Sequence, residues 1–94
     1  GMPIRMAELL ATIDGAVFVE RVALDSPAHV RKAKAAIMKA VEVQQKRLGF
    51  SFVEILSTCP TNWGYPPVKA LEWLRENMIP YYPLGNLRCP GEVK

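Results

Sequence analysis

Cys59 is the residue whose type and position most clearly suggest chemistry. It lies in Phe50–Asn62 (FSFVEILSTCPTN), where a β-branched and aromatic run gives way to a small-polar turn, and Pro60 follows it directly. A thiolate is a nucleophile and a ligand for soft metals, and open α/β sheets place their sites just past the carboxyl ends of strands. Composition alone favours another interpretation, because unpaired cysteines are often buried as small apolar residues. The residues by themselves leave both interpretations open.

The other reactive side chains of the sequence do not suggest a catalytic or disulfide partner for Cys59. His29 is the only histidine of the chain, and its place in the first turn of an expected helix predicts a solvated surface residue. A nucleophilic triad therefore has almost no support. Cys89 precedes a proline in an expected irregular tail, which favours an incidental thiol. A Cys59–Cys89 disulfide is disfavoured because the chain has no secretion signal, and neither a Cys-x-x-Cys pair nor a glycine-rich phosphate loop occurs.

Length and composition restrict the class of protein. Ninety-four residues, half of them apolar, suit one domain at most, predicted here as a single partial α/β domain over residues 1–94. A net charge of +3 is too small to indicate nucleic-acid binding. The basic residues between Arg31 and Arg47 favour a solvated helix face, with phosphates or acidic partners as the alternative. No apolar run approaches the roughly 20 residues that span a bilayer, and no signal peptide is present, so a cytoplasmic protein without a membrane role is expected.

The elements that must position Cys59 form a strand, a long helix and a second strand. Ala16–Leu24 is β-branched and nearly continuous, which predicts a strand buried on both faces, with Glu20 and Arg21 near an edge or a partner. Ser26 and Pro27 are typical of a helix start, and that helix is expected to run to about Leu48. The second strand begins at Phe50. The order predicts a βαβ unit with two parallel strands.

Two helices and a tail are expected to flank this unit. One helix is predicted over Met2–Ile13 and another from Pro67 to about Met78, where Pro80 stops it. The tail Tyr81–Lys94 is rich in proline and glycine, which predicts irregular structure. Two parallel strands cannot close a sheet, so each needs a neighbour, either further strands or another copy of the chain. The isolated chain is accordingly predicted to be a homo-oligomer.

Several stretches of the chain together resemble a known family. They are GFSFVEILSTCPTNW (49–63), PVKALEW (67–73), MIPYYPLG (78–85), PIRMAELL (3–10) and FVERV (18–22). These stretches resemble the C-terminal part of the thiamine-diphosphate-binding β subunit of 2-oxoacid:ferredoxin oxidoreductases, most closely the 2-oxoglutarate and branched-chain types. The resemblance covers essentially the whole chain. It implies that the helix, βαβ unit and helix are the C-terminal part of a larger parallel-sheet domain.

The resemblance also implies an activity, cofactors and partners for the intact enzyme. Such enzymes convert a 2-oxo acid, coenzyme A and oxidised ferredoxin to acyl-CoA, carbon dioxide and reduced ferredoxin, using thiamine diphosphate, Mg²⁺ and a [4Fe-4S] cluster. Cys59 matches the family's fourth cluster thiolate, and Thr61 and Asn62 are then candidates to orient the loop or donate hydrogen bonds toward sulfur. The implied partners are the remaining part of the β subunit, the α and the γ or δ subunits, and ferredoxin.

The chain also departs from the family pattern. In the family, the other three cluster cysteines and the Gly-Asp-Gly…Asn segment that binds magnesium lie upstream, and this sequence contains neither. The resemblance therefore implies that the isolated chain holds no cofactor and is inactive alone, as an excised domain or a split-gene product would be. The alternative is a stand-alone, non-catalytic interaction module that docks on a partner subunit through its open sheet edge and basic helix.

Overall fold

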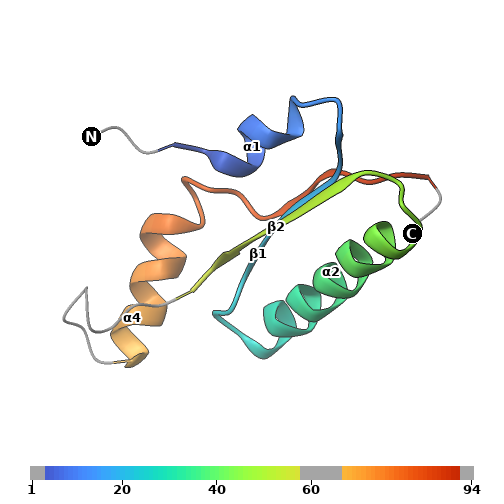
Figure 1. The fold of residues 1–94 in the computed structure, drawn as a ribbon. Helices are drawn as coiled ribbons and strands as arrows, with labels where there is room; N and C mark the ends of the chain where they lie inside the picture. The colour runs from blue at the N-terminus through green and yellow to red at the C-terminus, as the bar shows by residue number, and fades with distance from the viewer. Residues whose placement is uncertain (1–3, 58–66, 92–94) are drawn as a thin grey trace.

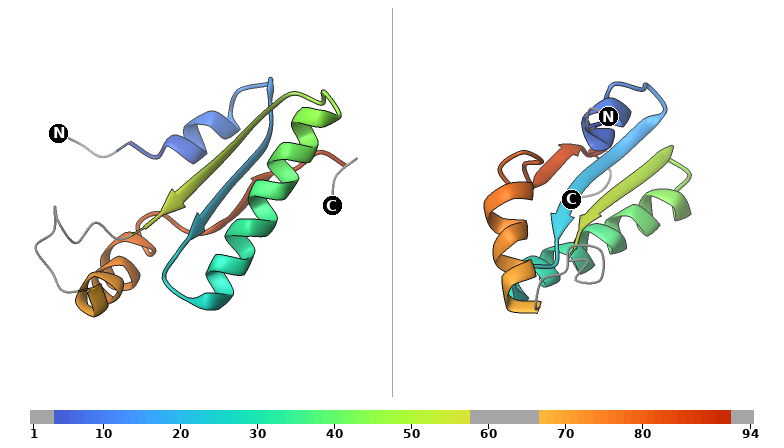
Figure 2. Two further views of the ribbon diagram at one scale, coloured as in Figure 1. Left: turned by 60° about the horizontal axis from the view of Figure 1, so that its bottom comes forward. Right: turned by 90° about the vertical axis from the view of Figure 1, so that its left-hand side faces the viewer.

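The computed structural model describes residues 4–57 and 67–91. These residues form a small α/β unit in which helices lie on both faces of a three-stranded sheet (Figures 1 and 2). The elements in chain order are α1 (Met6–Ala11), β1 (Ala16–Ala23), α2 (Pro27–Gln45), β2 (Phe50–Leu56), α4 (Pro67–Trp73), the π-helical turn η1 (Leu74–Met78) and β3 (Gly85–Arg88).

The predicted βαβ unit is present. β1 and β2 pair in parallel, with Val19 opposite Phe52, and α2 connects them. The start of α2 follows its local sequence, because the Ser26 hydroxyl accepts a hydrogen bond from the backbone N–H of His29 at 3.2 Å and Pro27 occupies the first turn. The α/β class and the parallel strand pair predicted from the sequence are therefore confirmed.

β1 is the central strand, and its two faces pack against different helices. On one face Phe18 contacts Val43 of α2. On the other face Val19 packs against α1, and Ala23 packs against Leu74 at the start of η1. The two views of Figure 2 show α2 on one side of the sheet and α1 and α4 on the other. Burial on both faces explains why the sequence of β1 is nearly continuous in apolar residues rather than alternating.

The third strand corrects an expectation from the sequence. The tail Tyr81–Lys94 was predicted to be irregular, but Gly85–Arg88 forms β3, which pairs antiparallel with β1. Gly85 has a φ of +143°, a conformation that side chains disfavour, and it lets the chain turn into the strand. The Asn86 amide then donates to the Glu20 carboxylate at 3.1 Å. The tail therefore supplies the neighbour that β1 was expected to find elsewhere, and the sheet order is β2-β1-β3.

The first flanking helix is shorter than predicted, whereas the second covers the predicted range Pro67–Met78 but changes its hydrogen-bonding pattern within it. α1 covers Met6–Ala11 of the expected Met2–Ile13. The helix that begins at Pro67 changes to π-helical hydrogen bonding over η1, where the Ile79 N–H donates to the Leu74 carbonyl at 3.0 Å. No helix within residues 4–57 and 67–91 combines the length and the apolar character needed to cross a bilayer.

Candidate functional site

The carboxyl ends of β1 and β2 lie side by side. Ala23 and Leu56 are register partners, and the Leu24 N–H donates to the Leu56 carbonyl at 3.0 Å. The chain therefore leaves both strands at the same edge of the sheet, which is where open α/β sheets place their sites. We call this the carboxyl edge.

The three residues predicted for the site follow β2 beyond this edge. Cys59, Thr61 and Asn62 lie outside the described residues, so their assignments stay predictions. In the sequence, Cys59 follows Leu56, the last residue of β2, by three residues.

A cluster of charged side chains occupies the carboxyl edge next to β1. Asp25 follows β1 directly, and its side chain is only 4% exposed. One carboxylate oxygen is hydrogen-bonded to Nδ1 of His29, at the first turn of α2, and the other accepts from Nε of Arg75 in η1 at 3.1 Å. A second Arg75 nitrogen donates to the Asp25 carbonyl. Asp25 therefore joins the end of β1 to one helix on each face of the sheet.

The electrostatics of this cluster keep Asp25 ionised. Burial acts to raise the pKa of Asp25, but the hydrogen bonds from His29 and Arg75 outweigh it, and the pKa is lowered from its ordinary value. The same hydrogen bond fixes the orientation of the His29 imidazole ring. His29 was predicted to be a solvated surface residue. Its side chain is instead 31% exposed and held by Asp25. The spacing of Asp25 and His29 across a helix start was the signal that could have indicated this pair.

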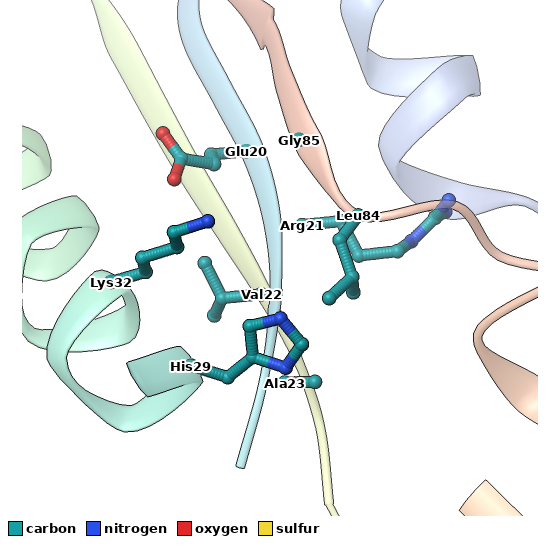
Figure 3. Close-up of a pocket in the computed structure, with 8 residues that line it drawn as sticks. All are labelled: Glu20, Arg21, Val22, Ala23, His29, Lys32, Leu84 and Gly85. Carbon is teal, nitrogen blue, oxygen red and sulfur yellow. The ribbon is translucent and has the colours of Figure 1, made fainter. Parts of the chain in front are cut away.

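A small cavity of about 130 Å³ lies next to His29 (Figure 3). Its walls come from β1, from the first turns of α2 and from the segment that enters β3. Figure 3 shows the His29 ring and the Lys32 amine from α2 directed toward the same space in front of Val22. The lining residues are Glu20, Arg21, Val22, Ala23, His29, Lys32, Leu84 and Gly85. No serine or cysteine is among these described lining residues, but His29, Lys32 and Glu20 belong to side-chain types that act as acids, bases or nucleophiles.

A second charged cluster lies inside the molecule rather than at the edge. Arg21 of β1 is fully buried, and its guanidinium donates twice to the Glu8 carboxylate of α1, at 2.5 and 2.7 Å. It also donates to Glu54 of β2 at 2.7 Å and to the Pro83 carbonyl at 3.3 Å, and it lies 5.2 Å from the centre of the Tyr82 ring. The hydrogen bond from Arg21 holds the pKa of Glu8 below its usual value. Because the guanidinium is buried and its donors are taken up by these partners, this cluster joins elements of the fold.

The donor atoms of this chain do not make a complete iron–sulfur site. In the part of the chain that the structure describes, no three His, Cys, Asp or Glu side chains gather closely enough to hold a metal ion. The whole sequence contains two cysteines, Cys59 and Cys89, whereas a [4Fe-4S] cluster takes four thiolates. Any such cluster needs thiolates beyond the two that this sequence contains.

Two curated proteins are similar to this chain over most of its length. The chain resembles oxidoreductases that act on 2-oxo acids. It is 43% identical over 88 residues to the ketoisovalerate oxidoreductase subunit VorA of Methanothermobacter marburgensis, and 42% identical over 88 residues to the subunit of the same name from Methanothermobacter thermautotrophicus. Each alignment covers 94% of this chain but 18% of the relative, so the chain spans about a fifth of the length of the curated relatives it matches. No family model matches the chain, and no solved structure does.

Proposed function

We propose that this chain is one segment of a 2-oxoacid:ferredoxin oxidoreductase subunit that acts on a branched-chain 2-oxo acid. The observation that carries the proposal is the 43% identity to VorA over 94% of this chain. Ketoisovalerate is a branched-chain 2-oxo acid, so the named relatives favour the branched-chain type over the 2-oxoglutarate type. The intact enzyme would convert its 2-oxo acid to acyl-CoA with reduction of ferredoxin, using thiamine diphosphate, Mg²⁺ and a [4Fe-4S] cluster. The isolated segment is not expected to turn over substrate.

Within this proposal, Cys59 is the cluster ligand that the segment contributes. A thiolate suits iron, Pro60 restricts the backbone that would aim it, and in the sequence Cys59 follows the end of β2 by three residues. Thr61 and Asn62 follow at once and offer hydroxyl and amide groups that can orient the loop or donate toward sulfur. The remaining ligands and the diphosphate site would come from the rest of the subunit.

The test compares the two cysteines in the complete enzyme. We expect Cys59→Ala to lower the iron content and the rate of ferredoxin reduction, because one cluster ligand is lost. Cys89→Ala is the matched control, since it removes the other thiol of the chain and should leave both measurements unchanged. An enzyme with Cys59→Ala that retained normal iron content and ferredoxin reduction would contradict the assignment of Cys59. Circular dichroism of each variant separates loss of the cluster from loss of the fold.

A second candidate function is a non-catalytic module that docks on a partner subunit. The observation that favours it is a group of exposed apolar side chains on the outer side of α2, where Met38 is 73% and Val41 51% exposed. Mixing this chain with the remaining part of the subunit separates the two proposals. A brown complex with a bound cluster supports the enzyme segment, whereas a stable complex without iron supports the module.

A further inference from the structure

The cavity next to His29 brings two opposite charges to one small space. Val22 of β1 packs against Ala33 of α2, and because side chains alternate along a strand, Glu20 lies on the same face of the sheet. Lys32 reaches this face from α2, and Figure 3 shows its amine directed to the space that the Glu20 carboxylate and the His29 ring also border. A cation and an anion therefore line the same cavity.

Both charged groups have hydrogen-bonding capacity left for a ligand. One oxygen of Glu20 accepts from the Asn86 amide of β3 at 3.1 Å, which positions the carboxylate, and its other oxygen has no hydrogen-bond partner among the described residues. Within the described ranges, the Lys32 amine has no ion-pair partner either. The N–H groups of this amine and one carboxylate oxygen are therefore available to a bound molecule.

The rest of the cavity wall supplies apolar surface and a fixed ring. Val22 is only 4% exposed, and Leu84 lies on the opposite side of the cavity, where the chain enters β3. The His29 ring is held by its hydrogen bond to Asp25. A molecule that matches this wall carries a small aliphatic group as well as its charges.

The volume of the cavity limits the ligand to a few heavy atoms. The cavity measures about 130 Å³, whereas a cavity of about 150 Å³ holds a molecule of the size of benzene, with roughly six heavy atoms. Opposite charges on one side and apolar atoms on the other match a small zwitterion. An α-amino acid with a short side chain, such as alanine, has this size and this arrangement of groups.

We propose that this cavity binds a small aliphatic α-amino acid. The carboxylate of the ligand accepts hydrogen bonds from the Lys32 amine, and its ammonium group donates to the free oxygen of Glu20. The short side chain lies against Val22. A simple anion would instead meet the repulsion of the Glu20 carboxylate, and a simple cation that of Lys32. None of the residues that the proposed function assigns takes part in this binding, so the two proposals are tested separately.

Titration of this chain with L-alanine, followed by NMR of the backbone amides, tests the proposal. We expect saturable shifts at Glu20, Lys32 and Gly85, with a Kd on the order of 1 mM for so small a ligand. Isobutyrate has a methyl group in place of the ammonium, and isopropylamine lacks the carboxylate. Each analogue should bind about 10-fold more weakly, because one charged hydrogen bond is lost. Shifts that do not saturate, or equal affinity for either analogue, would overturn the proposal.

Substitutions at the two charged groups locate the binding. Lys32→Gln and Glu20→Gln should each weaken L-alanine binding about 10-fold, because each removes one of the two charges. Lys34→Gln is the matched control, since Lys34 is a lysine of α2 that does not line the cavity. Circular dichroism of each variant verifies the fold. If Lys34→Gln weakened binding as much as Lys32→Gln, the amino acid would be responding to the general charge of the helix, and the proposal would fail.

Discussion

Replacement of Arg21 by methionine tests how strongly the buried ion cluster joins the elements of the fold. Arg21 is fully buried, while the side chains of Glu8 and Glu54 are 39% and 23% exposed. Removing one partner of a buried ion pair costs roughly 3 to 5 kcal/mol of stability. Because water can reach the two part-exposed carboxylates once Arg21 is gone, we expect a loss of about 3 kcal/mol, at the lower end of that range. A chain of this length has a total stability of roughly 5 to 14 kcal/mol. The substitution should therefore remove a fifth to more than half of that stability.

Urea denaturation followed by circular dichroism measures this loss. Glu8→Gln should cost about 1 kcal/mol or less, because the carboxylate it replaces is partly in water and the amide can still accept a hydrogen bond. Combining Arg21→Met with Glu8→Gln and Glu54→Gln should recover part of the stability lost in the single Arg21 variant, since no carboxylate then remains without its partner. If Arg21→Met costs less than Glu8→Gln, the buried guanidinium does not organise the cluster and this reasoning is refuted.

Three other predictions concern the carboxyl edge and the turns beside it. Asp25→Asn should make the free energy of unfolding less dependent on pH. Because the pKa of Asp25 is lower in the folded chain than in the unfolded chain, where it is about 3.9, ionised Asp25 stabilises the fold above that pH, and this stabilisation is lost as the pH falls through the folded-state pKa. Urea midpoints of the wild type and the variant, measured between about pH 2 and 7, show this pH dependence. Equal changes of the midpoint with pH in both proteins would contradict the role of Asp25. Ser26→Ala should lower the free energy of unfolding by about 1 kcal/mol, because the helix loses its cap. Ser26→Asn is the control, since it keeps a capping group, and equal urea midpoints for the wild type and the Ser26→Ala variant would argue against the cap. Gly49→Ala should destabilise the chain more than Ser26→Ala does, because Gly49 has a φ of +150° and a Cβ there would lie 2.8 Å from Cγ1 of Val17. Gly91→Ala, in open space, should leave the urea midpoint unchanged, and equal midpoints for both glycine variants would contradict this account.

The parts of the fold that the sequence predicts are those fixed by local signals. Ser26 and Pro27 start α2 where expected, because a cap and a first-turn proline act within a few residues. β3 was missed because its local sequence has proline and glycine on both sides, while its stability comes from pairing with β1, far away in the chain. Strand pairing depends on such distant partners, which strand propensities do not contain.

In the candidate site, too, local sequence predicts some features, while others depend on residues far apart in the chain. The position of Cys59 after a strand could be predicted from the sequence, since strand ends in α/β units are where sites occur. The hydrogen bond between Asp25 and Arg75 could not be predicted, because Arg75 lies 50 residues further along the chain. Arg21 gave a partial signal, since a charged residue inside an apolar strand needs a partner. Its two carboxylate partners come from α1 and β2, and only the packed fold identifies them.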